Sequence, residues 1–381
     1  MKSISVKTIH GQIVWSEAVY LDSQFILADP AIGLSNATLH ALKEWEFTEV
    51  LTEGEWNVKE AAVKKKEMAV EAILSTKPAG DEAKIDKASE LYETLKNYME
   101  TLFVQVAKEN KLDYNELSAL IAGVVPVIKE HKHFLMRAQN APPLEKEEGY
   151  QASHAVRCMI ISMIIGNYLK FSDTRLVELG IAALLHEIGM TKIPPVSKGY
   201  YNKRPLTQDE RKAIFSHPVF SYTVLKSFNA PLAVCLAGLE HHERENGSGY
   251  PQKLTGDKIS LYAKIIAVAC SYEALTANRP YRDAKDAYSG MYTVIKNEGK
   301  QYDPTIVKAL LYSLSLYPVG LYVLLSNGKK GQVVDIDPAN PFYPIVQIFG
   351  LFTPEGDKVA AQTSKNGIFI VRPLRKDEMA S

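Results

Sequence analysis

Apolar positions recur with a helical period through most of the chain and with a period of two near its end. From Asp81 onward they are spaced by three and four residues, at Ile85, Ala88, Tyr92, Leu95, Met99, Leu102 and Val106. This spacing is a heptad seam over three repeats, the minimum for a coiled coil. It predicts either a dimer stalk or one face of an intramolecular bundle, and the sequence leaves both open.

The pattern changes from helical to extended at Tyr317-Pro318. Residues 113–315 are helical in pattern, with breaks at proline- and glycine-rich points, and we expect a helical domain over 141–317. Beyond it, short alternating runs with turn residues between them predict strands. These runs are Leu321–Leu325, Gln332–Ile336, Pro344–Phe349 and Gly367–Val371. We therefore expect a mainly α fold with a β appendage and tail over 318–381.

Two further segments precede the helical domain. Residues 1–57 predict a small α/β regulatory module, with strand-like runs at Ser3–Ile9, at Phe25–Ala28 and near Val50, and a helix carrying Leu39, Leu42 and Trp45. Residues 58–140 predict a helical connector. Its Glu60–Leu74 segment contains three consecutive lysines, a run more typical of a solvated helix face than of a nucleic-acid patch.

Composition excludes several classes of function. The 44 basic and 44 acidic side chains balance, so there is no electrostatic footprint for duplex nucleic acid. No run of about 18 apolar residues predicts a membrane span, and the first residues do not resemble a signal peptide. The three cysteines form no disulfide framework and suit a reducing compartment. We expect a cytoplasmic protein.

Histidines carry the chemical signal of the sequence. Five of the nine fall at or beside the ends of predicted helices, at His154, His186, His217, His241 and His242. A single histidine at such a place is usually a core or capping residue, but five spread over several helices predict a metal site. His186 and Glu187 are adjacent on a helix and point about 100° apart, so they suit two neighbouring ions. Two ions about 3.5–4 Å apart are an arrangement for phosphate-ester hydrolysis.

Four sequence motifs resemble those of the HD-GYP family, which belongs to the HD superfamily of metal-dependent phosphohydrolases. Residues 183–189 read ALLHEIG, residues 241–251 read HHERENGSGYP, residues 269–282 read ACSYEALTANRPYR, and residues 302–304 read YDP. The resemblance covers about residues 150–335. The combination of His-His, Gly-Tyr-Pro and Arg-Pro-Tyr-Arg is highly specific.

The resemblance implies hydrolysis of the bacterial second messenger cyclic di-GMP to the linear dinucleotide or GMP, at a binuclear or trinuclear centre of iron or manganese. Zinc is a further candidate. The implied metal ligands are His154, His186, Glu187, His217, His241 and His242, with Cys270 at a further ligand position. The implied substrate-binding residues are Gly249, Tyr250 and Pro251 in a loop beside the site, and Arg279 and Arg282 at the phosphates. The loop could also bind a diguanylate cyclase domain.

The chain departs from the family pattern at several positions. Glu187 and Glu273 replace aspartates, and Cys270 replaces a metal-binding aspartate. Met190 stands where the family has a catalytic lysine, so no catalytic residue is assigned. Tyr150 stands where members with three metals have a glutamate, so we expect one or two transition-metal ions.

Two functions therefore stay open. The first is a metal-dependent phosphodiesterase, weakened by Met190 and Cys270, because these changes remove groups that can stabilise the transition state. The second is a degenerate domain that binds cyclic di-GMP or a partner without turning it over. We predict weak or absent hydrolysis with binding retained.

Overall fold

The structure is a computed structural model. It describes residues 2–9, 19–21, 26–28, 42–44, 47–53, 81–138, 149–193, 207–277, 284–317, 319–337, 340–353, 358–374 and 378. The chain divides into two compact units, Met1–Thr76 and Lys77–Ser381. The Glu60–Leu74 segment lies outside the described residues.

The first unit contains an antiparallel sheet with the order β1-β4-β2-β3. Its strands are β1 (Lys2–Ser5), β2 (Val19–Tyr20), β3 (Ile26–Ala28) and β4 (Glu49–Thr52), and residues 42–44 are helical. The prediction of one extended run over Ser3–Ile9 is wrong, because the chain turns at the 3-10 helix η1 (Val6–Thr8). With three residues per turn, this helix brings Val6 and Ile9 to the same buried core.

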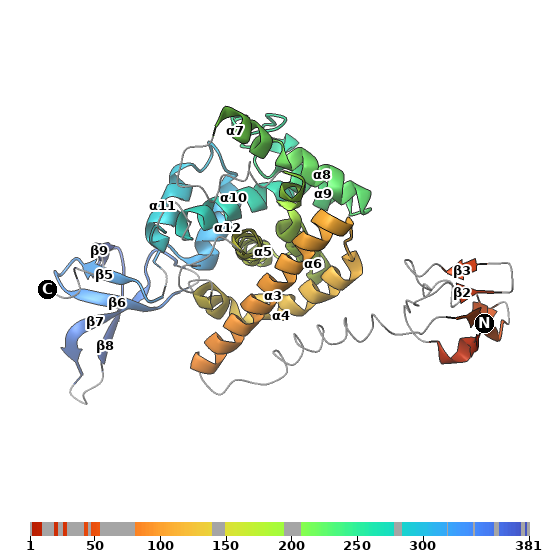
Figure 1. Ribbon diagram of the computed structural model, residues 1–381. Coiled ribbons are helices and arrows are strands. Elements are labelled where there is room, and N and C mark those ends of the chain that lie inside the picture. The colour runs from red at the N-terminus through yellow and green to blue at the C-terminus, as the bar shows by residue number, and fades with distance from the viewer. Residues whose placement is uncertain are drawn as a thin grey trace. The chain divides into compact units, whose positions relative to one another are not determined.

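The second unit is a helical domain built around one central helix. Its helices are α3 (Asp81–Glu109), α4 (Tyr114–Ala138), α5 (Tyr150–Tyr168), α6 (Asp173–Leu185), α7 (Gln208–Phe215), α8 (His217–Ser227), α9 (Leu232–Glu240), α10 (Leu261–Thr276), α11 (Ala287–Lys296) and α12 (Pro304–Leu314), with the short 3-10 helices η2 (Ile188–Lys192) and η5 (Gly256–Lys258). Helix α5 lies in the middle and packs against α3, α4, α6, α10 and α12 (Figure 1). The mainly α fold is confirmed.

The heptad seam of α3 is buried inside the chain. Ala88, Tyr92, Leu95, Met99, Leu102 and Val106 are each at most 4% exposed. Helix α3 packs against α4 and α5, so these side chains contact the chain's own helices. The seam is therefore a packing face of the helical domain, and a dimer through it would require the same side chains to leave the interior.

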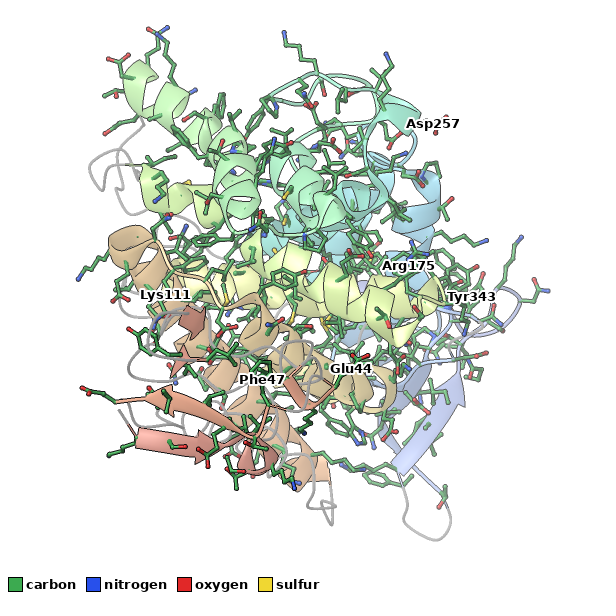
Figure 2. The ribbon with its side chains drawn as sticks, turned by 90° about the vertical axis from the view of Figure 1, so that its right-hand side faces the viewer. Glu44, Phe47, Lys111, Arg175, Asp257 and Tyr343 are labelled. Atoms are coloured by element: carbon green, nitrogen blue, oxygen red, sulfur yellow. The ribbon has the colours of Figure 1, made fainter. Side chains whose placement is uncertain are left out.

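Two helices begin earlier than the sequence pattern predicts, which is a helix over residues 155–168 opened by His154 and a helix over residues 177–185. Helix α6 begins at Asp173, because the Ser172 side chain accepts a hydrogen bond from the backbone N–H of Arg175 and caps its first turn. Arg175, which is labelled in Figure 2, is exposed at this first turn. Helix α5 begins at Tyr150. The prediction that His154 opens this helix is wrong, since His154 lies one turn inside it.

A five-stranded antiparallel sheet follows the helices, with the order β8-β7-β6-β5-β9. Its strands are β5 (Tyr322–Leu325), β6 (Lys330–Asp335), β7 (Ile345–Phe352), β8 (Lys358–Gln362) and β9 (Ile370–Pro373). The sequence pattern predicts four of these strands and misses β8. Among the described helices, none combines the length and the apolar character that crossing a membrane requires.

Candidate metal centre

The predicted ligand residues lie together in two adjoining groups. The thiol–histidine group consists of His154, Cys158, His186 and Cys270, and the carboxylate–histidine group of Glu187, His217, His241 and His242. Within each group, one possible ligand atom from every residue lies within 4.8 Å of the others. The structure therefore brings together all seven side chains that the resemblance implies as ligands and adds Cys158.

Helix ends position most of these side chains. His186 caps the C-terminus of α6 and His241 that of α9, with Glu187 and His242 directly after them, while His217 is the first residue of α8. Close packing of η2 on α8 fixes their relative positions. A Cβ on Gly189 would lie 2.1 Å from the carbonyl oxygen of His217, so no larger residue fits there.

Backbone carbonyls orient three of the imidazoles. In each case the ring Nδ1 bonds to the carbonyl oxygen three residues earlier: His186 to Ala183 at 2.7 Å, His217 to Ile214 at 2.6 Å and His241 to Gly238 at 3.0 Å. A carbonyl oxygen can only accept, so each Nδ1 is the protonated nitrogen and each Nε2 has a free lone pair. This is the tautomer of a histidine that binds a metal through Nε2.

Two of these lone pairs face one another. The Nε2 atoms of His217 and His241 are 3.1 Å apart, and with Nδ1 protonated on both rings neither can donate to the other. The arrangement is repulsive unless a cation shares the two nitrogens. The donor set therefore fits a metal ion.

Glu273 orients the remaining buried histidine. Its Oε2 is 2.7 Å from Nδ1 of His154, and Arg157 is 3.8 Å from its other oxygen. The carboxylate holds the Nδ1 proton of His154, so Nε2 faces the site. Glu273 is 1% exposed and acts as a second-layer partner of a ligand, a role the sequence motif alone did not reveal.

Glu187 belongs to the carboxylate–histidine group and also lies close to the thiol–histidine group. Its Oε1 is 4.0 Å from Nε2 of His154 and 3.9 Å from Nε2 of His217. Burial opposes ionisation of this carboxyl, but His217 and His154 outweigh burial, and its pKa is below its usual value. A charged carboxylate between two sets of imidazoles can bridge two cations.

Burial and neighbouring charges shift the histidine pKa values of the two groups in different directions. Burial lowers the pKa of His217, and burial with the adjoining imidazoles lowers the pKa values of His241 and His242 well below the usual range. Burial also acts to lower the pKa of His154, but the Glu273 carboxylate outweighs it and raises this pKa well above its usual value. The carboxylate–histidine group is therefore neutral at its imidazoles near pH 7 and ready to bind a cation without releasing protons.

The Gly-Tyr-Pro loop packs against the carboxylate–histidine group. The ring of Tyr250 stacks on His242 with centroids 4.6 Å apart and on Phe215 at 4.7 Å. A Cβ on Gly249 would lie 2.5 Å from the Cα of Glu243, so the chain can approach this closely only with glycine. Glu243 then accepts hydrogen bonds from the backbone N–H of Gln252 at 2.6 Å and of Leu254 at 3.0 Å, which holds the loop over the site.

Of the other predicted site positions, the structure describes Met190 but not the two arginines. Met190 is 1% exposed, and its backbone N–H donates to the carbonyl oxygen of Glu187 at 2.9 Å. Arg279 and Arg282 lie outside the described residues. Cys158 was missed by the sequence reasoning, although it lies four residues after His154 and therefore on the same face of α5.

The two ligand groups lie within a region that matches a known domain family. The profile of the HD domain matches residues 128–306. The cyclic di-GMP phosphodiesterase PdeB of Borreliella burgdorferi is 32% identical over 197 residues, which are 52% of this chain and 52% of that protein. The cyclic di-GMP phosphodiesterase PA4108 of Pseudomonas aeruginosa is 27% identical over 326 residues, or 83% of this chain and 76% of that protein. The chain thus spans about half the length of PdeB.

A solved structure shares the fold. Bd1817, an HDG"Y"P protein from Bdellovibrio bacteriovorus, matches 81% of this chain and 97% of its own with a TM-score of 0.52 and 15% identity. The HD domain implies dependence on divalent metal, and the two groups here are able to hold it. Residues 128–306 thus match the HD domain, and around this centre lie the His-His and Gly-Tyr-Pro signatures through which the sequence resembles the HD-GYP family.

Proposed function

We propose that the protein is a metal-dependent phosphodiesterase that hydrolyses cyclic di-GMP to the linear dinucleotide or to GMP. The observation that carries the proposal is the pair of ligand groups with Glu187 between them. The names of PdeB and PA4108 support the choice of substrate. Retention of both groups favours turnover over a receptor without activity.

The two ligand groups would hold two ions with different ligands. Glu187, His217, His241 and His242 would hold one ion and the thiol–histidine group another; iron or manganese is our first choice, with zinc as a third candidate. Such ions supply a nucleophilic water near neutral pH and neutralise phosphoryl charge. The Nδ1–carbonyl bonds keep each Nε2 turned toward the centre, so no ligand must reorient during binding.

Residues outside the ligand set would position the nucleotide. The stacked pair of Tyr250 and His242 offers an aromatic wall beside the centre. Arg279 and Arg282 remain our predicted phosphate contacts, since a guanidinium pairs well with phosphate. Met190 supplies no proton or cation to the departing ribose oxygen, so we expect turnover to be slow. A diguanylate cyclase domain as partner of the loop stays a prediction.

The test is hydrolysis of cyclic di-GMP by the purified full chain, loaded without oxygen with Fe²⁺, Mn²⁺ or Zn²⁺. We expect slow, metal-dependent formation of linear dinucleotide or GMP, measured by chromatography. The matched control is Glu187→Gln, which keeps the size of the side chain and removes the charge between the groups. Nucleotide binding without hydrolysis under every metal would contradict the proposal and favour the receptor.

A further inference from the structure

Two thiols meet in the interior of the helical domain. Cys158 on α5 and Cys270 on α10 have their Sγ atoms 3.2 Å apart. Cys158 is fully buried, and it is a ligand candidate that the sequence motifs do not imply. The third cysteine, Cys235 on α9, is not part of either ligand group and donates to the carbonyl oxygen of Ala230 instead.

Two imidazole nitrogens face the same thiols. Nε2 of His186 is 3.4 Å from Sγ of Cys270, and both ring nitrogens of His154 are 3.7 Å from Sγ of Cys158. The Nδ1 atoms of both rings are engaged elsewhere, with the Ala183 carbonyl and the Glu273 carboxylate. One nitrogen of each ring and the two sulfurs therefore all lie within 4.8 Å of one another.

Small movements of these side chains would give the spacing of the ligands around a tetrahedral ion. Metal–nitrogen and metal–sulfur bonds of about 2.0–2.3 Å place the ligand atoms of a tetrahedron about 3.3–3.8 Å apart. The atoms of the thiol–histidine group are 3.2 Å apart at the closest pair and all lie within 4.8 Å of one another. The group reaches four ligands without Glu187, which leaves that carboxylate to the other group.

We propose that the thiol–histidine group is a closed His2Cys2 site for a thiophilic ion such as Zn²⁺ or Fe²⁺, with all four ligands from the protein. Four protein ligands leave no position for water, so this ion holds α5, α6 and α10 together around the centre. Water activation then falls to the ion of the carboxylate–histidine group. Only this division of roles rests on the proposed function, and the four-ligand site stands without it.

Cobalt is a direct probe of the two thiolates. The full chain, stripped of metal under reducing conditions, is titrated with Co²⁺, and thiolate-to-cobalt charge-transfer absorption is recorded. We expect a strong band in the unmodified protein and loss of about half its intensity in Cys158→Ser and in Cys270→Ser, since each removes one of two sulfur ligands. The matched control Cys235→Ser should keep the full band. A band that Cys158→Ser leaves unchanged would overturn the proposal.

The unmodified protein gives a second readout that does not depend on variants folding. Loaded with one equivalent of Zn²⁺, it should show sulfur neighbours at about 2.3 Å in X-ray absorption at the metal edge. A shell of nitrogen and oxygen alone, or a Cys158–Cys270 disulfide in the metal-loaded protein, would overturn the proposal. Sulfur ligation without hydrolysis would refute the proposed function alone, whereas hydrolysis without sulfur ligation would refute this inference alone.

Discussion

The two ligand groups of the centre differ in both chemistry and access. The thiol–histidine group offers two sulfurs and two nitrogens, and its histidines and Cys158 are buried. The carboxylate–histidine group offers oxygen and nitrogen, with Glu187 and His242 partly exposed beside the Tyr250 loop. Soft thiolates select zinc or iron, whereas imidazole and carboxylate accept a wider range of ions. A single centre can thus combine a retained structural ion with an exchangeable one that meets water.

The largest expected effect comes from breaking the carboxylate–histidine group. His241→Ala removes a ligand whose Nε2 lies 3.1 Å from that of His217, and we expect cyclic di-GMP hydrolysis to fall by at least about 10³-fold. The thiolate-to-cobalt band should survive, because its sulfurs belong to the other group. The exposed His131 provides a control, since His131→Ala should leave both readouts unchanged. Loss of the band together with activity would show that the two groups do not bind independently.

Restoring the two residues that the family has at positions 190 and 270 should raise hydrolysis of cyclic di-GMP. Met190→Lys combined with Cys270→Asp supplies a cation near the phosphate and converts the thiol–histidine group into a harder site. We expect hydrolysis to rise by about 10²-fold, the scale of one regained transition-state contributor, as measured by initial rates. Each single variant serves as control. Unmodified protein that already matches relatives retaining both residues would show that Met190 and Cys270 cost nothing.

Removing the support of His154 should weaken the thiol–histidine group alone. Glu273→Gln replaces the carboxylate that bonds to Nδ1 of His154 at 2.7 Å, and such partners contribute about 10–100-fold to metal affinity. Competition with a chelator measures the loss. Glu240→Gln is a matched control, because Glu240 is also buried but accepts from the backbone N–H of Ser260 at 2.7 Å. Equal losses in both variants would indicate general destabilisation instead.

Proton release on metal binding should also separate the groups. Burial raises the pKa of Cys158 well above its usual value, so its thiol must lose a proton when a metal binds near pH 7. Affinity of the thiol–histidine group should rise about tenfold per pH unit for each proton released. His217, His241 and His242, with lowered pKa values, release none. Calorimetry in buffers of different ionisation enthalpy, with Cys158→Ser as comparison, counts these protons.

The same lowered pKa values predict that the metal-free protein becomes less stable in acid. His241 and His242 bind protons more readily unfolded than folded, so the free energy of unfolding falls as the pH drops below about 6.5. His154 has the opposite sign, because its raised pKa contributes stability that is fully present below about pH 6.5 and is lost as the pH rises through that raised value.

The sequence predicted the ligands better than their surroundings. Histidines at the ends of apolar runs were recognisable, because a polar residue at such a place requires a structural or chemical explanation. His186, His217 and His241 do lie at helix ends. Cys158 carried no such signal, because a buried cysteine inside an apolar helix is ordinary core. The partnership of Glu273 with His154 depends on packing of α10 against α5, which is a tertiary fact.

The fold, like the site, was only partly predictable from the sequence. The α3 seam could not be assigned to a dimer or a bundle, because either would bury the same stripe, and only the contacts with α4 and α5 decide. Strand β8 was missed because its residues Lys358–Gln362 alternate between exposed and partly exposed positions, with no strong apolar face. Helix starts were displaced where capping rather than periodicity fixes them, as at Ser172.

The smallest predicted effect concerns the loop that covers only the carboxylate–histidine group. Glu243→Gln replaces a carboxylate that accepts from the N–H groups of both Gln252 and Leu254, and an amide nitrogen cannot accept from one of them. Leaving that partly buried N–H unpaired costs about 1 kcal/mol in the free energy of unfolding, measured by denaturant titration. Because Tyr250 would lose its fixed stacking on His242, KM for cyclic di-GMP should rise more than kcat falls, while the thiolate-to-cobalt band stays unchanged. Glu240→Gln keeps an oxygen that can accept from its one N–H partner, that of Ser260, so it should alter neither stability nor KM. An equal change of KM in both variants would show that the loop does not position the nucleotide.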